Sequence, residues 1–228
     1  DYTYIPELRG FITEPRTYIS VPDFPVRTFL TKNISDCDLF AVRNRMLGDC
    51  FKIRDEYGGN IKWRYSNHAM LRYVPKEIYF TSENRAVNAH LYQLNEKGEP
   101  IDVCMTDGID ENGEEDESMP VSAFKIVLES LKKIIADDEN CNYISIGQMD
   151  HTDACSCPKC VSRAKKYGRG GINVIFGNLL LKKLRAWMAK NGLKRNIKLV
   201  FFAYNYSVYA PVCRKNGRII PAVKADKD

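Results

Sequence analysis

The residues best suited to chemistry lie in one segment, residues 144–160, which reads ISIGQMDHTDACSCPKC. Its apolar, strand-like beginning stops abruptly, and three cysteines follow by position 160. Two thiolates separated by two residues can chelate one ion, so Cys157 and Cys160 have the spacing of a zinc knuckle. Cys155 adds a third thiolate. The segment therefore predicts a structural zinc site as one possibility.

Zinc is one of three states that this spacing allows. The chain has no second C-x-x-C pair, so a disulfide and free thiols stand as alternatives to a metal ion. Only His151 or Asp153 lies within sequence reach as a fourth zinc ligand. The other five of the eight cysteines are scattered, which is typical of free, buried, small apolar side chains. In each state the cysteines would pin the loop after Asp150 and stiffen the rim of a site.

The elements that must position this segment alternate between strands and helices. Strand-like patterns occupy residues 24–30, 60–66, 101–105, 143–146 and 197–203, and helical patterns occupy residues 37–47, 119–138 and 172–190. Alternation of this kind favours βα units around a parallel sheet. Residues 72–100 are rich in aromatic and turn-forming residues, and we expect a long functional loop there.

The lack of a phosphate-binding loop narrows the α/β classes. No strand-like pattern is followed by G-x-G-x-x-G or by G-x-x-x-x-G-K-S/T, so an open nucleotide-binding sheet is not indicated. A (β/α) TIM-barrel-like fold is the remaining prediction. A complete barrel has eight strands in about 250 residues. We therefore expect a partial or truncated barrel, in which residues 1–228 form a single domain without the last strands.

In a barrel, the residues that follow the strands face one shared hollow. The polar residues at these positions are Arg27, Asn67, His68, Thr106, Asp107, Gln148, Asp150, Tyr204 and Asn205. Such a set suits a sugar, because sugar hydroxyls need donors and acceptors while the apolar face of the ring stacks on aromatic side chains. The predicted substrate-binding residues are Arg27, Asn67, His68, Gln148 and Tyr204. His68 has a plain structural alternative as a hydrogen-bonding residue.

Glycoside hydrolysis uses two carboxylates, one as acid and one as nucleophile or base. Asp150 is the first catalytic candidate, because a position after a buried strand would partly desolvate its side chain and raise its proton affinity. Asp107 is the only other carboxylate at a predicted strand end. The alternative for Asp150 is to cap the following turn through its side chain. Arg27, if it lies inside a barrel, needs Asp150 or Asp107 as an anionic partner.

Charge and hydropathy exclude other classes of partner. The net charge is +5, from 34 basic and 29 acidic residues, and the basic residues are dispersed rather than gathered in a stripe. We therefore expect no nucleic-acid partner. No apolar run approaches the ~20 residues of a transmembrane helix, so we expect no membrane span.

Several stretches together give the chain a family resemblance. They are FPVRTFL, DLFAVRNRML, NHAML, VPKEIYF, DVCMTD, the whole 144–160 segment and FFAYNYSVYAPV. Over roughly residues 22–213 the sequence resembles domain of unknown function family 4838, a bacterial family related to glycoside hydrolase barrels. The most specific part is D-x4-C-x-C-x2-C, present here as Asp150, Cys155, Cys157 and Cys160.

The resemblance implies a glycoside hydrolase-like (β/α) barrel that hydrolyses or binds a glycan at the carboxyl ends of its strands. It also implies a secreted or cell-surface protein of a bacterium. The related family 20 hexosaminidases carry an Asp-Glu pair where this chain has Gln148-Met149-Asp150-His151, so their substrate-assisted chemistry does not carry over. The alternatives are a non-catalytic carbohydrate-binding or accessory module and a zinc-stabilised interaction domain.

Overall fold

The computed structural model describes residues 17, 26–27, 36–46, 53–65, 67–216 and 218–225. Most of the strand predicted at 24–30 lies outside these residues, and so does the end of the helix predicted at 37–47. The described part of that helix is α1 (Asp38–Arg43). A 3-10 turn, η1 (Asp55–Tyr57), follows it.

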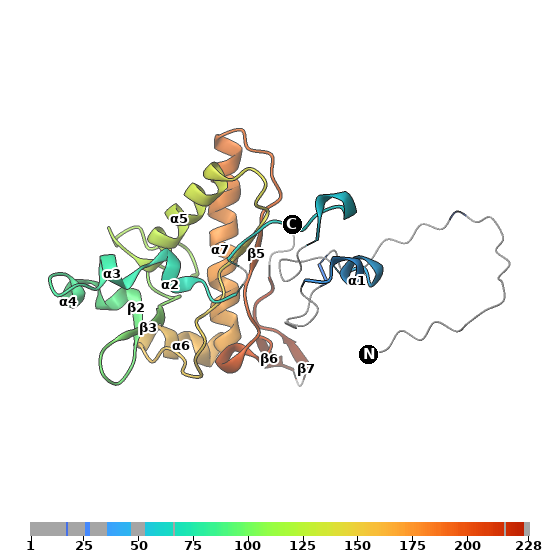
Figure 1. Cartoon of the computed structure of the whole chain (residues 1–228). Coiled ribbons are helices and arrows are strands. Elements are labelled where there is room, and N and C mark those ends of the chain that lie inside the picture. Colours follow the sequence, from blue (N-terminus) through green and yellow to red (C-terminus); the bar gives the residue numbers. More distant parts are fainter. Residues whose placement is uncertain are drawn as a thin grey trace.

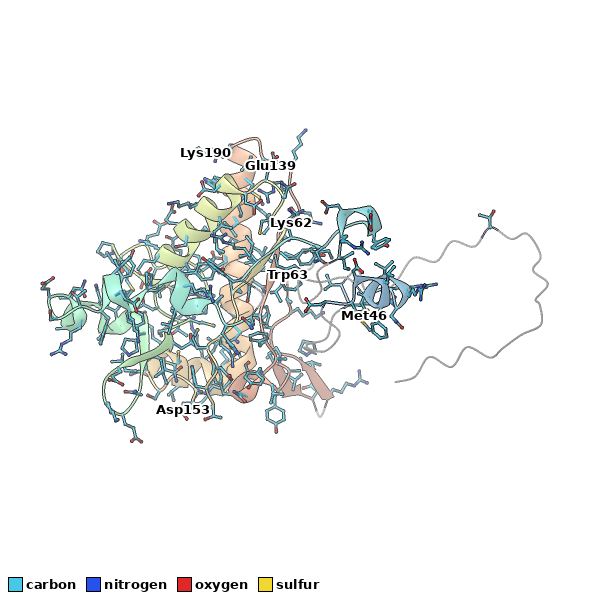
Figure 2. All side chains as sticks on the ribbon, in the orientation of Figure 1. Met46, Lys62, Trp63, Glu139, Asp153 and Lys190 are labelled. Carbon is cyan, nitrogen blue, oxygen red and sulfur yellow. The ribbon has the colours of Figure 1, made fainter. Side chains whose placement is uncertain are left out.

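A three-stranded parallel sheet forms the centre of the fold. It consists of β1 (Trp63–Arg64), β4 (Tyr143–Ser145) and β5 (Lys198–Val200) in the order β1-β4-β5. Trp63, which is labelled in Figure 2, lies opposite Tyr143 in the pairing of the two strands. The rings of these two residues stack, with 5.1 Å between their centroids. Pairing continues beyond the strands, because His68 forms a parallel bridge with Gly147. The first two strands are thereby aligned where the candidate site begins.

Two long helices pack beside this sheet (Figure 1). A shorter helix comes between β4 and the longer of them in the sequence. These helices are α5 (Ala123–Asp137), α6 (Pro158–Tyr167) and α7 (Arg169–Lys190). Ser122 is the N-cap of α5, and its hydroxyl accepts a hydrogen bond from the Lys125 N–H. Phe124 and Phe176 are fully buried and meet edge to face at 5.9 Å, which joins α5 to α7.

The region predicted as an irregular loop is mostly ordered into short elements. It contains α2 (Met70–Tyr73), α3 (Lys76–Tyr79), α4 (Arg85–Asn88), the 3-10 turn η2 (Ala89–Leu91) and β2 (Tyr92–Leu94). Strand β2 pairs antiparallel with β3 (Pro100–Val103). Near the end of the chain, the 3-10 turn η3 (Asn205–Ser207) precedes a second hairpin of β6 (Val212–Lys215) and β7 (Arg218–Pro221).

The prediction of a TIM-barrel-like fold is wrong. Within the described residues the fold is mixed α/β, and its parallel sheet has only three short strands with open edges, so no barrel closes. The segment predicted as a further parallel strand at 101–105 belongs to the β2–β3 hairpin instead. The turn between these strands explains the difference, because the Asn95 side chain accepts hydrogen bonds from the backbone N–H groups of Lys97 and Glu99.

The described helices include none that is both long enough and apolar enough to cross a bilayer.

Candidate functional site

Asp150 lies five residues beyond the end of β4, at the carboxyl edge of the parallel sheet. Its Oδ1 accepts a hydrogen bond from the Tyr204 hydroxyl at 2.9 Å, and its Oδ2 lies 4.0 Å from His68 Nε2. The structure therefore brings together three of the residues that the sequence singled out. The predicted desolvation of Asp150 is not observed, because 65% of its side chain is exposed.

His68 is held in one orientation by the backbone of the segment that follows β4. Its Nδ1 donates a hydrogen bond to the Gln148 carbonyl at 2.5 Å, and this bond leaves Nε2 on the Asp150 side. The His68 ring also packs against Phe202, with 5.0 Å between ring centroids. Phe202 and Tyr204 meet edge to face at 6.1 Å. An aromatic wall thus stands beside the exposed carboxylate.

Gly147 allows this close packing. A Cβ atom at residue 147 would overlap the Phe202 ring and would press on the backbone oxygen of Asn67. Only glycine fits where a ring and a neighbouring strand approach the backbone so closely. Asn67 itself is exposed beside the site, and its carbonyl accepts a hydrogen bond from the Ser145 hydroxyl.

The structure places Gln148 in the interior. It is completely buried, and its amide nitrogen donates to the Tyr204 carbonyl at 2.9 Å. Its amide oxygen accepts hydrogen bonds from Asn173 at 3.0 Å and from Ser207 at 2.7 Å. Gln148 therefore joins the end of β4 to α7 and to the η3 turn, and so fixes where Tyr204 lies.

The segment between β4 and α6, called here the Asp150 loop, is held by a buried carboxylate that the sequence analysis did not single out. Asp102 of β3 is completely buried, and its Oδ2 accepts hydrogen bonds from the Met149 N–H at 2.9 Å and from His151 Nε2 at 3.2 Å. The hydrogen bond to Asp102 raises the pKa of His151 above its ordinary value, against the opposing effect of burial. Tyr206 stacks on the His151 ring, at 5.9 Å between centroids.

Four cysteines lie close together, three of them just after Asp150 in the sequence and one on the neighbouring β3 segment. Cys104, at the end of β3, lies 3.8 Å from the sulfurs of Cys157 and Cys160 and 4.0 Å from that of Cys155. All four sulfurs lie within 4.8 Å of one another. We call this group the four-cysteine cluster. The fourth member is Cys104 rather than His151, which pairs with Asp102 instead.

The spacing of the sulfurs fits a tetrahedral metal site. Four sulfurs at about 2.3 Å from one ion stand about 3.8 Å apart. A disulfide needs about 2.05 Å, so none joins the members of the four-cysteine cluster, which are free thiols here. The cluster can therefore hold a metal ion. Hydrogen bonding from the Cys104 thiol lowers the pKa of Cys157.

Local structure prepares the cluster. Cys157 is the N-cap of α6 and Pro158 is its first residue, so the C-x-x-C pair opens a helix that the sequence analysis did not predict. The Thr106 hydroxyl lies 3.1 Å from the Cys160 sulfur, and the Arg169 guanidinium donates to the Cys155 carbonyl at 2.7 Å. The thiols are thus held by β3, by the start of α6 and by the start of α7.

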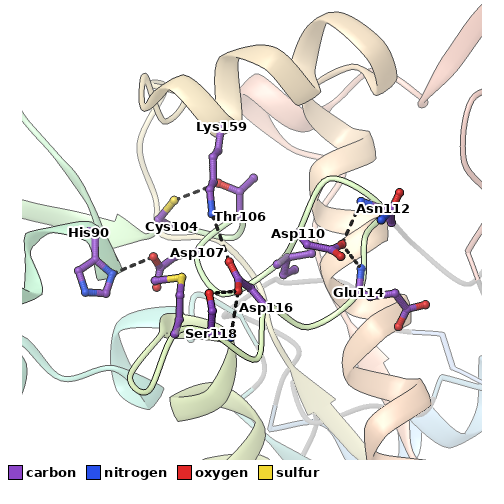
Figure 3. Close-up of polar contacts among 12 residues, drawn as sticks. His90, Cys104, Thr106, Asp107, Asp110, Asn112, Glu114, Asp116, Ser118 and Lys159 are labelled. Atoms are coloured by element: carbon purple, nitrogen blue, oxygen red, sulfur yellow. Dashed lines mark hydrogen bonds and ion pairs between the residues drawn. The ribbon is translucent and has the colours of Figure 1, made fainter.

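The structure does not pair the two remaining predicted residues, Asp107 and Arg27, with Asp150. Asp107 accepts hydrogen bonds from His90 Nδ1 at 2.8 Å and from the Ala123 N–H at 2.7 Å, and it lines a cavity to which Asp150 does not contribute (Figure 3). Arg27 is half-buried, and among the described residues it makes no ion pair with Asp150 or Asp107. The structure therefore does not join the two predicted catalytic carboxylates in one site.

Comparisons with known proteins were made for the whole chain. Searches of the curated proteins and of the solved structures gave no match. Residues 1–220 match one family model, which is described as Domain of unknown function (DUF4838). The match covers nearly all of the 228 residues, and the chain therefore belongs to the DUF4838 family.

Proposed function

We propose that this domain binds carbohydrate at the surface formed by Asp150, His68 and Tyr204, called here the Asp150 site. The observation that carries the proposal is the pair of contacts around Asp150, 2.9 Å to the Tyr204 hydroxyl and 4.0 Å to His68 Nε2, at the carboxyl edge of a parallel sheet. Ligands of α/β sheets commonly bind at this edge. The proposal includes a secreted or cell-surface location in a bacterium, which the family resemblance suggested.

The chemistry of the Asp150 site suits a sugar. An exposed carboxylate accepts hydrogen bonds from two hydroxyls at once, and His68 Nε2 and the Tyr204 phenol oxygen add further acceptors. Tyr204 is 41% exposed, and with His68 and Phe202 it offers ring faces beside these polar atoms. Backbone contacts and buried side chains fix each group, so little conformational entropy is lost when a ligand binds.

Binding has more support than hydrolysis. Hydrolysis by acid and base requires a second carboxylate within about 5–9.5 Å of the first. The predicted partner, Asp107, has both oxygens engaged by His90 and by the Ala123 N–H. The Asp150 site therefore has the groups to bind a glycan but lacks the second carboxylate that hydrolysis was predicted to use.

We further propose that the metal at the four-cysteine cluster is zinc in a structural role. Four thiolates in a tetrahedral arrangement leave no open position, and this favours a structural zinc ion over a catalytic one. The ion would tie Cys104 of β3 to both ends of the short Cys155–Cys160 stretch. Because this stretch follows the Asp150 loop directly, zinc would stabilise the Asp150 site without touching a ligand.

A glycan array with matched variants tests the carbohydrate proposal. The zinc-loaded wild-type domain is screened first, and affinity for the best glycan is then measured for Asp150→Asn and Asp153→Asn. Both residues are exposed acids of the same loop, so the control removes the same charge three residues away. Loss of a charged hydrogen-bond acceptor should weaken binding about tenfold in Asp150→Asn only. Equal effects of the two substitutions, or no glycan binding by the wild type, would refute the proposal.

A further inference from the structure

A cavity lined in part by the four-cysteine cluster shares no lining residue with the Asp150 site. Its volume is about 560 Å³, within the usual range for small-molecule sites. The lining consists of Ala89, His90, Tyr92, Leu94, Cys104, Thr106, Asp107, Met119, Cys155, Ser156, Cys157, Pro158 and Lys159. We call it the His90 pocket. Neither Asp150 nor His68 contributes to it.

The polar centre of the His90 pocket is a histidine oriented by a buried carboxylate (Figure 3). Asp107 has a 7% exposed side chain, whereas the side chain of His90 is 38% exposed. One carboxylate oxygen lies 2.8 Å from His90 Nδ1, and the other accepts from the Ala123 N–H at the start of α5. Asp107 therefore cannot turn, and it holds the proton on Nδ1. The lone pair of His90 Nε2 is left free to accept a hydrogen bond.

Helix capping alone does not account for this pair. The start of α5 needs only the bond from the Ala123 N–H to Asp107, and Ser122 caps the same end. His90 adds nothing to that role, and a partly exposed ring bound through one nitrogen is the arrangement that presents the other nitrogen to a ligand.

The charges around the His90 pocket select the kind of ligand. Asp107 and the cluster thiolates are negative, and four thiolates around one divalent ion keep a net negative charge, so an anion is disfavoured. The Lys159 ammonium also lines the pocket, but its charge is offset by the Asp116 carboxylate at 3.9 Å (Figure 3). Tyr92, Leu94 and Met119 supply apolar wall. The pocket therefore favours a molecule that has an apolar body and carries no negative charge.

We propose that the His90 pocket is a second ligand site, which takes a small, hydroxyl-bearing molecule without negative charge, whose hydroxyl donates to His90 Nε2. The apolar body of the ligand packs against Tyr92, Leu94 and Met119. This inference does not depend on carbohydrate binding at the Asp150 site, because the two sites share no lining residue.

Two probes with the same apolar body test the proposal: benzyl alcohol and benzoate. Binding to the zinc-loaded domain is followed by NMR at the Met119 methyl group and at the His90 ring. Benzyl alcohol should shift both signals in a saturable way, and benzoate should bind at least about fivefold more weakly. The proposal is overturned if benzoate binds as tightly as benzyl alcohol, or if benzyl alcohol shifts neither signal.

Variants separate a ligand-binding His90 from a merely structural one. Read at the Met119 methyl, His90→Ala should weaken benzyl alcohol binding about fivefold, while Val87→Ala, an exposed change three residues away, should not. Asp107→Asn keeps the pocket wall but leaves a single acceptor oxygen for two donors, His90 Nδ1 and the Ala123 N–H, so it loosens the hold on His90 and should weaken binding as well. If His90→Ala lowers thermal stability, Asp107→Asn decides the question. Unchanged benzyl alcohol affinity in a folded His90→Ala or Asp107→Asn variant contradicts the proposal.

Discussion

The sharpest prediction concerns Cys104, the member of the four-cysteine cluster that lies farthest from the others in the sequence. Its sulfur is 3.8–4.0 Å from the other three sulfurs, so Cys104→Ser removes one of the four sulfur ligands of the proposed metal site. Serine keeps the shape of the side chain and a hydroxyl, but its oxygen is a poor zinc ligand at neutral pH. The substitution therefore tests metal binding with little change in packing.

The expected loss follows from the number of ligands. Structural zinc in small tetrahedral sites contributes about 10–16 kcal/mol of binding free energy. An equal share for each of four ligands is about 2.5–4 kcal/mol, which corresponds to about 10²–10³-fold weaker zinc binding. Because binding free energy adds to folding free energy, Cys104→Ser should also lower the zinc-dependent part of the thermal stability.

A zinc competition titration with a chromophoric chelator measures this loss. Cys141→Ser is the matched control, because Cys141 is a buried free cysteine outside the cluster. Zinc affinity should fall in Cys104→Ser and stay at the wild-type value in Cys141→Ser. Wild-type affinity in Cys104→Ser, or an equal loss in both variants, would refute the reasoning that Cys104 completes the site.

Three further predictions concern the framework. Phe176→Ala should lower the free energy of unfolding by about 3–5 kcal/mol in chemical denaturation, because the ring is fully buried. Gly108→Ala should destabilise the fold in the same assay, since residue 108 has φ +80° and a Cβ there would overlap the Ser122 side chain. The raised pKa of His151, caused by Asp102, should stabilise the fold fully below about pH 6.5 and lose effect as pH rises through the folded-state pKa. Urea unfolding of wild type and His151→Gln should therefore differ more at about pH 5.5 than at about pH 8.5.

The long helices were predictable from the sequence because their apolar spacing is regular. Phe124, Val127, Leu128 and Leu131 are all buried on one face of α5, as the 3.6-residue period indicated. The strands at 143–146 and 197–203 were also located correctly, although each forms fewer paired residues than predicted. Local patterns carry this information because burial of one face repeats along the element.

Pairing partners were not predictable in the same way. The stretch at 101–105 has the composition of a buried strand, but its partner β2 lay in a region that looked irregular. Strand alternation therefore suggested a barrel where the chain forms a hairpin. An acidic residue inside that apolar stretch, Asp102, was the available signal that the stretch faces a polar loop.

The sequence predicted those members of the candidate site that follow parallel strands. Asp150, His68 and Tyr204 follow parallel strands, and the structure brings them together. Cys104 lies 51 residues before Cys155, so only the fold shows that it belongs to the four-cysteine cluster. Asp107 also follows a strand, but this strand is antiparallel and directs it to His90 instead.

The most direct test of the carbohydrate proposal uses the three histidines of the chain as reporters. The glycan selected on the array is titrated into zinc-loaded protein while the ring signals of His68, His90 and His151 are recorded by NMR. The His68 signals should shift and saturate at the glycan concentration that saturates binding, with the His90 signals unmoved. A saturated complex in which His68 keeps its free-state signals would show that the glycan binds elsewhere.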